Sequence, residues 1–254
     1  MYRQHEKIVR WLALTMVLSC LKLIMFVLDS NPQVFLGDSG TYLATAQAKL
    51  IPPDRSFVYG FLVRLLTRNS HSLHSVVAAQ AFAGIATSLL VAYILIRFFN
   101  TRFVIAALAA IVLTLEPQQL LFERFVLTES FSTAAFALLV FLALEYLRGR
   151  RLWVLACMQV AGVILISLRM TFLPAVLITT ILAPIIAFWR ERKRGLWPVG
   201  VHLAISVVLF AGLHSGYKHW YGWLANQPPA YSYADGFFLI ANVSTLVTPE
   251  DTDD

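Results

Sequence analysis

The chain has 254 residues, of which 59% are hydrophobic and only 13% are charged, and its mean hydropathy is +0.71. The core of one soluble domain does not bury so much apolar side chain, so the composition excludes a soluble globular protein and indicates an integral membrane protein. The net charge of +6 requires no nucleic-acid partner, because basic residues also gather on one side of membrane proteins. Cys20 and Cys157 lie within apolar runs, so no disulfide framework or metal cluster is expected.

Long apolar runs mark the expected membrane crossings. A helix needs about 20 apolar residues to cross about 30 Å of hydrocarbon, where the backbone must satisfy its own hydrogen bonds. We therefore predict an all-α polytopic membrane protein with about seven transmembrane helices in one domain, residues 1–254. The expected crossings are residues 8–28, 74–99, 103–115, 128–147, 152–168, 171–189 and 196–216. The third and fifth are short, so either flanking residues extend them or their ends meet a water-filled cavity.

The basic residues gather on one side of these crossings. If the N-terminus is cytoplasmic, that side holds only three acidic residues, and the other eleven of the fourteen lie outside. By the positive-inside rule we predict a cytoplasmic N-terminus in the plasma (inner) membrane, with residues 29–75 and 217–254 outside. The basic residues placed on the cytoplasmic side are Arg3, Lys7, Arg10, Arg97, Arg102, Arg148, Arg150, Arg151, Arg190, Arg192, Lys193 and Arg194.

The first outer loop, residues 29–75, is too long and too regular in pattern to be a simple turn. Apolar residues recur at helical spacing from Tyr42 to Leu50 and again from Val58 to Leu66, with two prolines between the runs. Both runs are predicted to be helices lying in the membrane interface. Arg64 and Arg68 form a separate stripe on the second helix. They contact lipid headgroups in one reading and bind a phosphate in the other.

Asp38 is the first candidate for chemistry, in the sequence Gly37-Asp38-Ser39-Gly40-Thr41-Tyr42-Leu43. It lies just outside the first crossing, on the side opposite the basic loops. An aspartate there could act as a general base at the lipid surface, or it could only N-cap the helix expected to begin near Ser39.

The connection between the third and fourth crossings carries three glutamates, Glu116, Glu123 and Glu129. Each costs free energy near hydrocarbon unless it is hydrated or paired. Glu129 follows Thr128 in the first turn of a crossing, where a carboxylate is favoured by the helix dipole, so helix capping or catalysis can account for it. Arg124 lies in the same connection.

Two cations lie close to the expected outer edge of the membrane. Arg169 stands between two apolar segments, where it either snorkels to headgroups or binds a lipid-linked phosphate through paired hydrogen bonds. Lys22 lies within the first crossing. It is expected to snorkel towards Asp29 or the headgroups, or to contact a phosphate.

Taken in order, these motifs resemble a known family. A basic N-terminus and one crossing precede Gly37-Asp38-x-x-x-Tyr42-Leu43-x-x-Ala46; Leu127-Thr128-Glu129 opens a later crossing, and Leu168-Arg169 divides the next helix pair. This pattern is similar to the C-type (GT-C) membrane glycosyltransferases, in particular the protein O-mannosyltransferase and aminoarabinose-transferase group. The resemblance covers nearly the whole chain.

The resemblance implies a polyprenyl-phosphate sugar donor, an extracytoplasmic active site and transfer with inversion, with Asp38 as the general base. Two positions depart from the family pattern: Ser39 replaces a second acid, and Thr41 replaces a basic residue found in some relatives. Relatives are usually longer, with further crossings, so a shortened member, an inactive member and a fragment all stay open.

The expected chemistry needs a base for the acceptor hydroxyl and positive charge on the departing phosphate. We predict Asp38 and Glu129 as catalytic residues and Tyr42 and Glu123 in the substrate cavity, with the donor phosphate bound by Arg64, Arg68, Arg124 and Arg169. The acceptor is a glycan, a lipid or a protein. No metal ligands are predicted, although a divalent cation (Mg²⁺ or Mn²⁺) could assist through carboxylates. A non-catalytic membrane scaffold and a lipid or glycan transporter (flippase) are the alternatives.

Overall fold

The structure is a computed structural model that describes residues 2–55, 57–189 and 197–231. Within these residues it is all-helical, and the only β-type pairing is an isolated bridge between Gln33 and Phe125. The helices are α1 (Tyr2–Leu28), α2 (Asp38–Ala48), α3 (Phe57–Thr67), α4 (His74–Phe99), α5 (Phe103–Thr114), α6 (Pro117–Arg124), α7 (Glu129–Gly149), α8 (Leu152–Leu168), the short 3₁₀ helix η1 (Met170–Phe172), α9 (Leu173–Phe188) and α10 (Trp197–Ala225). The predicted all-α class is therefore confirmed.

Local chemistry explains several helix ends. Asn100 and Arg150 adopt the left-handed conformation that commonly ends a helix, directly after α4 and α7. Pro117 opens α6, where a missing N–H costs nothing, and the Glu116 carboxylate accepts a hydrogen bond from the Gln119 N–H at 2.5 Å. The connection expected between the third and fourth crossings thus contains a helix.

Five helices are long and apolar enough to cross a membrane: α1, α4, α7, α10, and α9 together with η1. α5 has 12 residues and rises about 18 Å, which is too short to cross alone. α5 is long and apolar enough to cross a membrane only together with α6, from which it is bent by 48°. This pair would make a sixth span. α8, with 17 residues, is a shorter apolar helix. Seven crossings therefore stay a prediction that requires both the bent pair and α8 to span.

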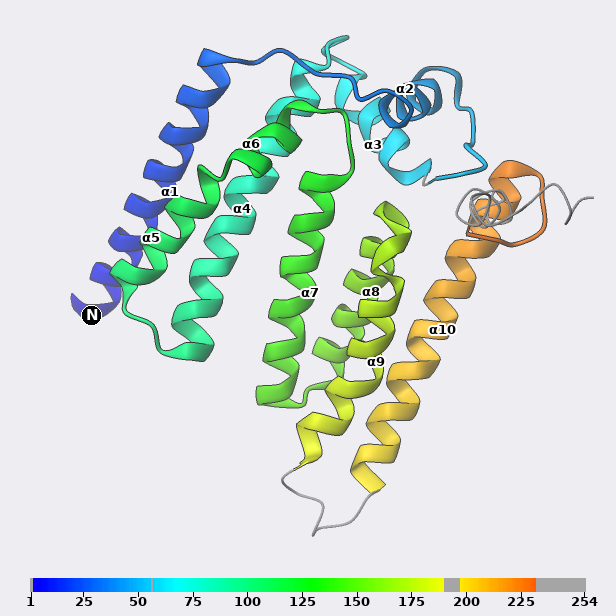
Figure 1. The fold of residues 1–254 in the computed structure, drawn as a ribbon. Helices are drawn as coiled ribbons and strands as arrows, with labels where there is room; N and C mark the ends of the chain where they lie inside the picture. The colour runs from blue at the N-terminus through cyan, green and yellow to red at the C-terminus, as the bar shows by residue number, and fades with distance from the viewer. Residues whose placement is uncertain (1, 56, 190–196, 232–254) are drawn as a thin grey trace, which may run out of the picture.

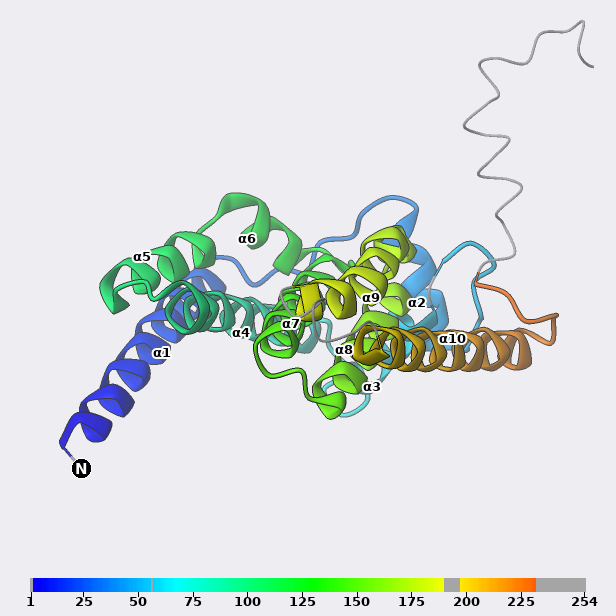
Figure 2. The same cartoon turned by 90° about the horizontal axis from the view of Figure 1, so that it is seen from below.

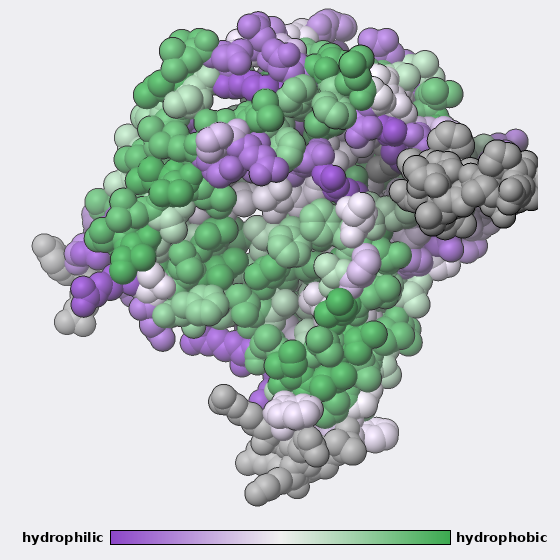
Figure 3. Space-filling model, in the orientation of Figure 1, coloured by the Kyte–Doolittle hydropathy of each residue, from purple (hydrophilic) through white to green (hydrophobic). Residues whose placement is uncertain are grey.

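The long helices form two adjoining groups (Figures 1 and 2). In the first, Leu14 and Leu18 of α1 pack with alanines of α4 and α5. In the second, α7, α8, α9 and α10 enclose a core that includes Leu155 and Phe210. On the face drawn in Figure 3, hydrophobic surface covers the middle of the molecule between polar ends. This distribution fits a protein whose long helices face lipid.

One end of the molecule carries α2, α3 and α6; we call it the loop end (Figure 1). α1, α5 and α8 finish there, and α4, α7 and α9 begin there. Helices are present at both places predicted for the first outer loop, but whether they lie in the membrane interface stays a prediction. The compartment that the loop end faces is likewise a prediction. Residues 232–254, most of the predicted outer C-terminal segment, lie outside the described residues.

Candidate functional site

Three charged side chains meet where α2 begins. Arg55, in the connection between α2 and α3, donates hydrogen bonds to Asp38 and Asp54, and its Nε lies 2.9 Å from Asp54 Oδ2. Burial lowers the pKa of Arg55, but the hydrogen bonds to Asp54 and Asp38 outweigh that effect and shift it upwards. The guanidinium therefore stays charged and fixes one oxygen of the Asp38 carboxylate.

Asp38 is itself the first residue of α2. Gly37 occupies the N-cap position with a φ of +93°, a conformation that favours glycine. The alternative that Asp38 only N-caps a helix beginning at Ser39 does not match this arrangement, because the Asp38 carboxylate binds Arg55 and its side chain is 45% exposed. A half-exposed carboxylate with one oxygen held by a cation is available to accept a proton from a substrate.

Tyr42 lies one turn further along α2 and is buried. Burial raises the pKa of Tyr42 to about 12, with a further upward contribution from Asp38 and a smaller one from Glu129. Its ring packs edge-on against Tyr59 of α3, with the ring centroids 4.8 Å apart. Because both carboxylates act on the same hydroxyl, Tyr42 marks the place where the start of α2 approaches the start of α7.

Glu129 forms an ion pair across the start of α7. Its Oε1 accepts a hydrogen bond from Arg169 Nη1 at 2.5 Å, from the residue that directly follows α8. Its Oε2 is buried and has no hydrogen-bond partner among the described residues, and neither has the hydroxyl of Ser130 beside it. Arg169 stays 43% exposed. At the loop end, Asp38 and Glu129 thus both act on Tyr42, and Arg169 pairs with Glu129; two acceptors there have no partner among the described residues.

The other predicted phosphate ligands lie apart from this group. Arg124 donates a hydrogen bond to the Met25 carbonyl at 2.6 Å, and its guanidinium lies over the Phe26 ring of α1. Arg64 is half-buried on α3, with one guanidinium nitrogen buried and without a partner among the described residues. Arg68 is exposed just after α3. None of the described contacts joins these three arginines to Arg169.

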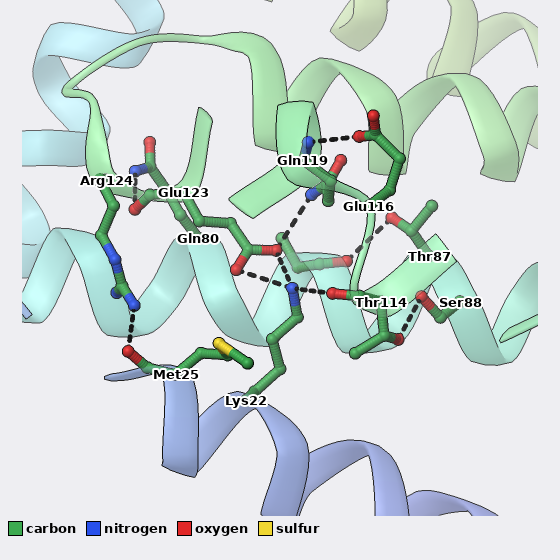
Figure 4. A network of polar contacts seen from close by, with 11 residues as sticks. Lys22, Met25, Gln80, Thr87, Ser88, Thr114, Glu116, Gln119, Glu123 and Arg124 are labelled. Carbon is green, nitrogen blue, oxygen red and sulfur yellow. Dashed lines mark hydrogen bonds and ion pairs between the residues drawn. The ribbon is translucent and has the colours of Figure 1, made fainter. Parts of the chain in front are cut away.

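Glu123 lies in an ion pair that the sequence did not reveal (Figure 4). Lys22 Nζ lies 2.7 and 2.9 Å from the two carboxylate oxygens of Glu123 and 2.8 Å from the Thr114 carbonyl oxygen, at the end of α5. Gln119 Nε2 lies 3.1 Å from Glu123 Oε1. The side chains of Lys22 and Glu123 are 4% and 2% exposed. Lys22 therefore pairs inside the protein, and the expectation that it snorkels is wrong.

Arg55 and the partner of Lys22 were not predicted, for different reasons. Arg55 carried a usable signal, because it follows a double proline in the outer loop and stands next to an aspartate. The pairing of Lys22 with Glu123 carried none, because the two residues are 101 positions apart. Among the described residues, no group of three or more His, Cys, Asp or Glu side chains is placed to hold a metal ion.

No protein-family model matches the chain, and neither a curated protein nor a solved structure is similar enough to it to count as a match. The resemblance to the C-type glycosyltransferases therefore rests on the short motifs quoted above.

Proposed function

We propose that this protein is a glycosyltransferase that moves a sugar from a polyprenyl-phosphate donor to an acceptor hydroxyl at the loop end, on the extracytoplasmic side, with inversion. The supporting observation is the meeting of Asp38, Tyr42, Glu129 and Arg169 at that end. It combines a half-exposed carboxylate with a half-exposed guanidinium, as a base and a phosphate ligand require.

Asp38 acts as the base. Arg55 holds one of its oxygens, and the other accepts the proton of the acceptor hydroxyl. The acceptor oxygen then forms a bond to the anomeric carbon from the face opposite the phosphate. As the bond between that carbon and the phosphate oxygen breaks, its electron pair leaves with the phosphate. One proton moves to Asp38, and the polyprenyl phosphate carries the negative charge away.

Arg169 neutralises the departing phosphate. Its Nη1 is engaged by Glu129, but the side chain is partly exposed and a guanidinium carries five N–H donors. Tyr42, whose raised pKa keeps it protonated at physiological pH, can donate a hydrogen bond to the sugar or the phosphate. Glu129 orients Arg169. The acceptor that provides the hydroxyl is a glycan, a lipid or a protein.

Asp38→Asn tests this proposal, with Asp54→Asn as the matched control. Asparagine keeps the shape of the side chain and an oxygen for Arg55 but cannot accept the proton, so we expect transfer to fall by about 10²–10⁴-fold in Asp38→Asn. Asp54 also binds Arg55, but Arg55 keeps Asp38, so Asp54→Asn should change transfer by less than about tenfold. Transfer of labelled hexose and aminoarabinose from polyprenyl-phosphate donors is measured in nanodiscs. Near-normal transfer by Asp38→Asn would exclude Asp38 as the base.

A transporter of lipid-linked sugars is the second candidate, favoured by one observation. The helix break between α5 and α6 carries a buried ion pair, and broken helices with paired charges occur at the binding sites of transporters. A flippase would move the labelled lipid between leaflets without cleaving the bond to the sugar. Product analysis in proteoliposomes that hold the labelled donor distinguishes the two activities. No described contact favours the third alternative, a non-catalytic scaffold.

A further inference from the structure

The buried pair of Lys22 and Glu123 is linked to the start of α2 by a short series of hydrogen bonds. Glu123 is the next-to-last residue of α6, and the chain directly after it, residues 124–126, lies against residues 33–39. The Gln33 N–H donates to the Arg124 carbonyl at 2.8 Å, and the Val126 N–H donates to the Gln33 carbonyl at 3.0 Å. This is the isolated β-bridge noted above, and it ties the two loops together.

Ser39 continues the series to Asp38. Its hydroxyl donates to the Val126 carbonyl at 2.9 Å and accepts the Phe35 N–H at 2.9 Å. The Ser39 side chain is fully buried, so water cannot readily replace either partner. Asp38 is its immediate neighbour in the chain. The position of residues 124–126 therefore sets where α2 begins.

A second series of contacts, made by side chains, links the end of α6 to Tyr42 of α2. Gln80 of α4 donates through Nε2 to the carbonyls of Glu123 and Phe125, at 3.0 and 2.9 Å, and its Oε1 accepts the Tyr59 hydroxyl at 2.8 Å. Tyr59 in turn packs on Tyr42. Both series start from the end of α6, and α6 is joined to α1 by the bond between Lys22 and Glu123.

Gly84 of α4 leaves room for this pair. A β-carbon at this position would lie 2.1 Å from Glu123 Oε1, a distance at which one atom has to move. A side chain at residue 84 would therefore force the Glu123 carboxylate to shift from its position beside Lys22. Gly84 gives a means of displacing the pair without removing a charge.

We propose that Lys22 and Glu123 are positioning residues that hold the end of α6 against α1 and thereby fix the start of α2. On the proposed function, this places Asp38 for proton transfer. The two residues touch neither substrate nor Asp38, and they act through residues 124–126 and Ser39. A buried ion pair suits this role because breaking it leaves an uncompensated charge, so only one arrangement of α1 and α6 is stable.

Backbone hydrogen exchange of the full chain in nanodiscs tests the inference without relying on transfer activity. In Lys22→Met we expect exchange of the peptides covering 33–39 and 124–127 to accelerate at least about tenfold, with α7–α10 unchanged. The double variant Lys22→Met/Glu123→Leu leaves no buried charge, so it should fold stably, but it also lacks the bond between α1 and α6, so exchange of the same two peptides should stay fast. Arg97→Met, which breaks a half-exposed pair with Glu145, is the control and should leave both peptides unchanged.

If Lys22→Met does not fold, Gly84→Ala takes its place and should accelerate the same two peptides. Unchanged exchange at 33–39 in a folded variant would overturn the proposal, and so would equal acceleration in all helices, since that indicates a general loss of stability. Transfer is measured in parallel. If exchange responds as expected but Asp38→Asn keeps its activity, the positioning role stands and the proposed function fails.

Discussion

The ion pair at the start of α7 and the ion pair between α1 and α6 are built from similar side chains in different surroundings. In the first, Glu129 and Arg169 are 16% and 43% exposed; in the second, Lys22 and Glu123 are 4% and 2% exposed. An exposed pair contributes little to stability, so it can exchange one partner for a ligand at small cost. A buried pair cannot, because a lone charge would remain away from water. On the proposed function, this difference fits a role in chemistry for the first pair and a positioning role for the second.

A buried network of uncharged side chains can be compared with these two ion pairs. Gln159 of α8 donates to Ser206 of α10 at 2.8 Å and accepts the Thr180 hydroxyl of α9 at 2.9 Å, while Ser206 donates to the Thr180 carbonyl at 2.8 Å. All three side chains are buried, and the hydrogen bonds link three helices. Hydrogen bonds between helices of this kind join membrane helices at modest free energy.

Thiol labelling has the largest expected effect, because it is all or none. With both native cysteines replaced by alanine, a cysteine at Leu36 or Gln118, both exposed at the loop end, should react with an impermeant reagent added to intact cells. A cysteine at Gly149, at the opposite end, should react only after permeabilisation. The reverse labelling pattern would place the loop end, with the pairs Asp38–Arg55 and Glu129–Arg169, in the cytoplasm. The proposed extracytoplasmic reaction could then not occur there.

The next effect concerns the buried pair. Lys22→Met should lower the free energy of unfolding by about 3–5 kcal/mol, because Glu123 is left as an unpaired buried charge. Lys22→Met/Glu123→Leu should recover most of that loss. The measurement is denaturant titration in dodecylmaltoside micelles. A loss in the double variant as large as in Lys22→Met would mean that packing around Lys22, and not the charge left behind, determines the cost.

The neutral network should be less sensitive. Gln159→Leu removes the partner of the Thr180 hydroxyl and one partner of Ser206, so we expect a loss of about 1–2 kcal/mol in the same titration. Ser132→Ala is the control for loss of a buried hydroxyl, because among the described residues this hydroxyl bonds only to the carbonyl of Thr128, the N-cap of its own helix. A loss in Gln159→Leu equal to that in Lys22→Met would remove the distinction between charged and neutral buried networks.

The smallest stability effect is expected at the half-exposed pair. Arg169→Lys keeps the charge but not the planar fork of the guanidinium, so stability should change by less than about 1 kcal/mol. Binding of polyprenyl phosphate in nanodiscs should nevertheless weaken, whereas Arg97→Lys at the opposite end should bind normally. Unchanged affinity in Arg169→Lys would favour the headgroup contact over the donor phosphate.

Part of the site could be read from the sequence because its signals are local. Asp38 follows an apolar run, Glu129 opens one, and Arg169 separates two, so their placement at membrane edges follows from hydropathy. The same local pattern does not decide whether α5 and α8 cross the membrane. It counts apolar residues and cannot tell where a helix bends, as α5 and α6 do at Glu116.

The sequence by itself determined that the chain is helical and apolar enough to enter a membrane, since both follow from residue types at short spacing. Only the tertiary structure decided which charges meet. Lys22 and Glu123 pair across 101 positions, Arg55 joins Asp38 across 17, and Arg124 turns towards α1 and away from the predicted phosphate ligands. A buried charge needs a partner, but which partner it finds depends on the helices packed against it.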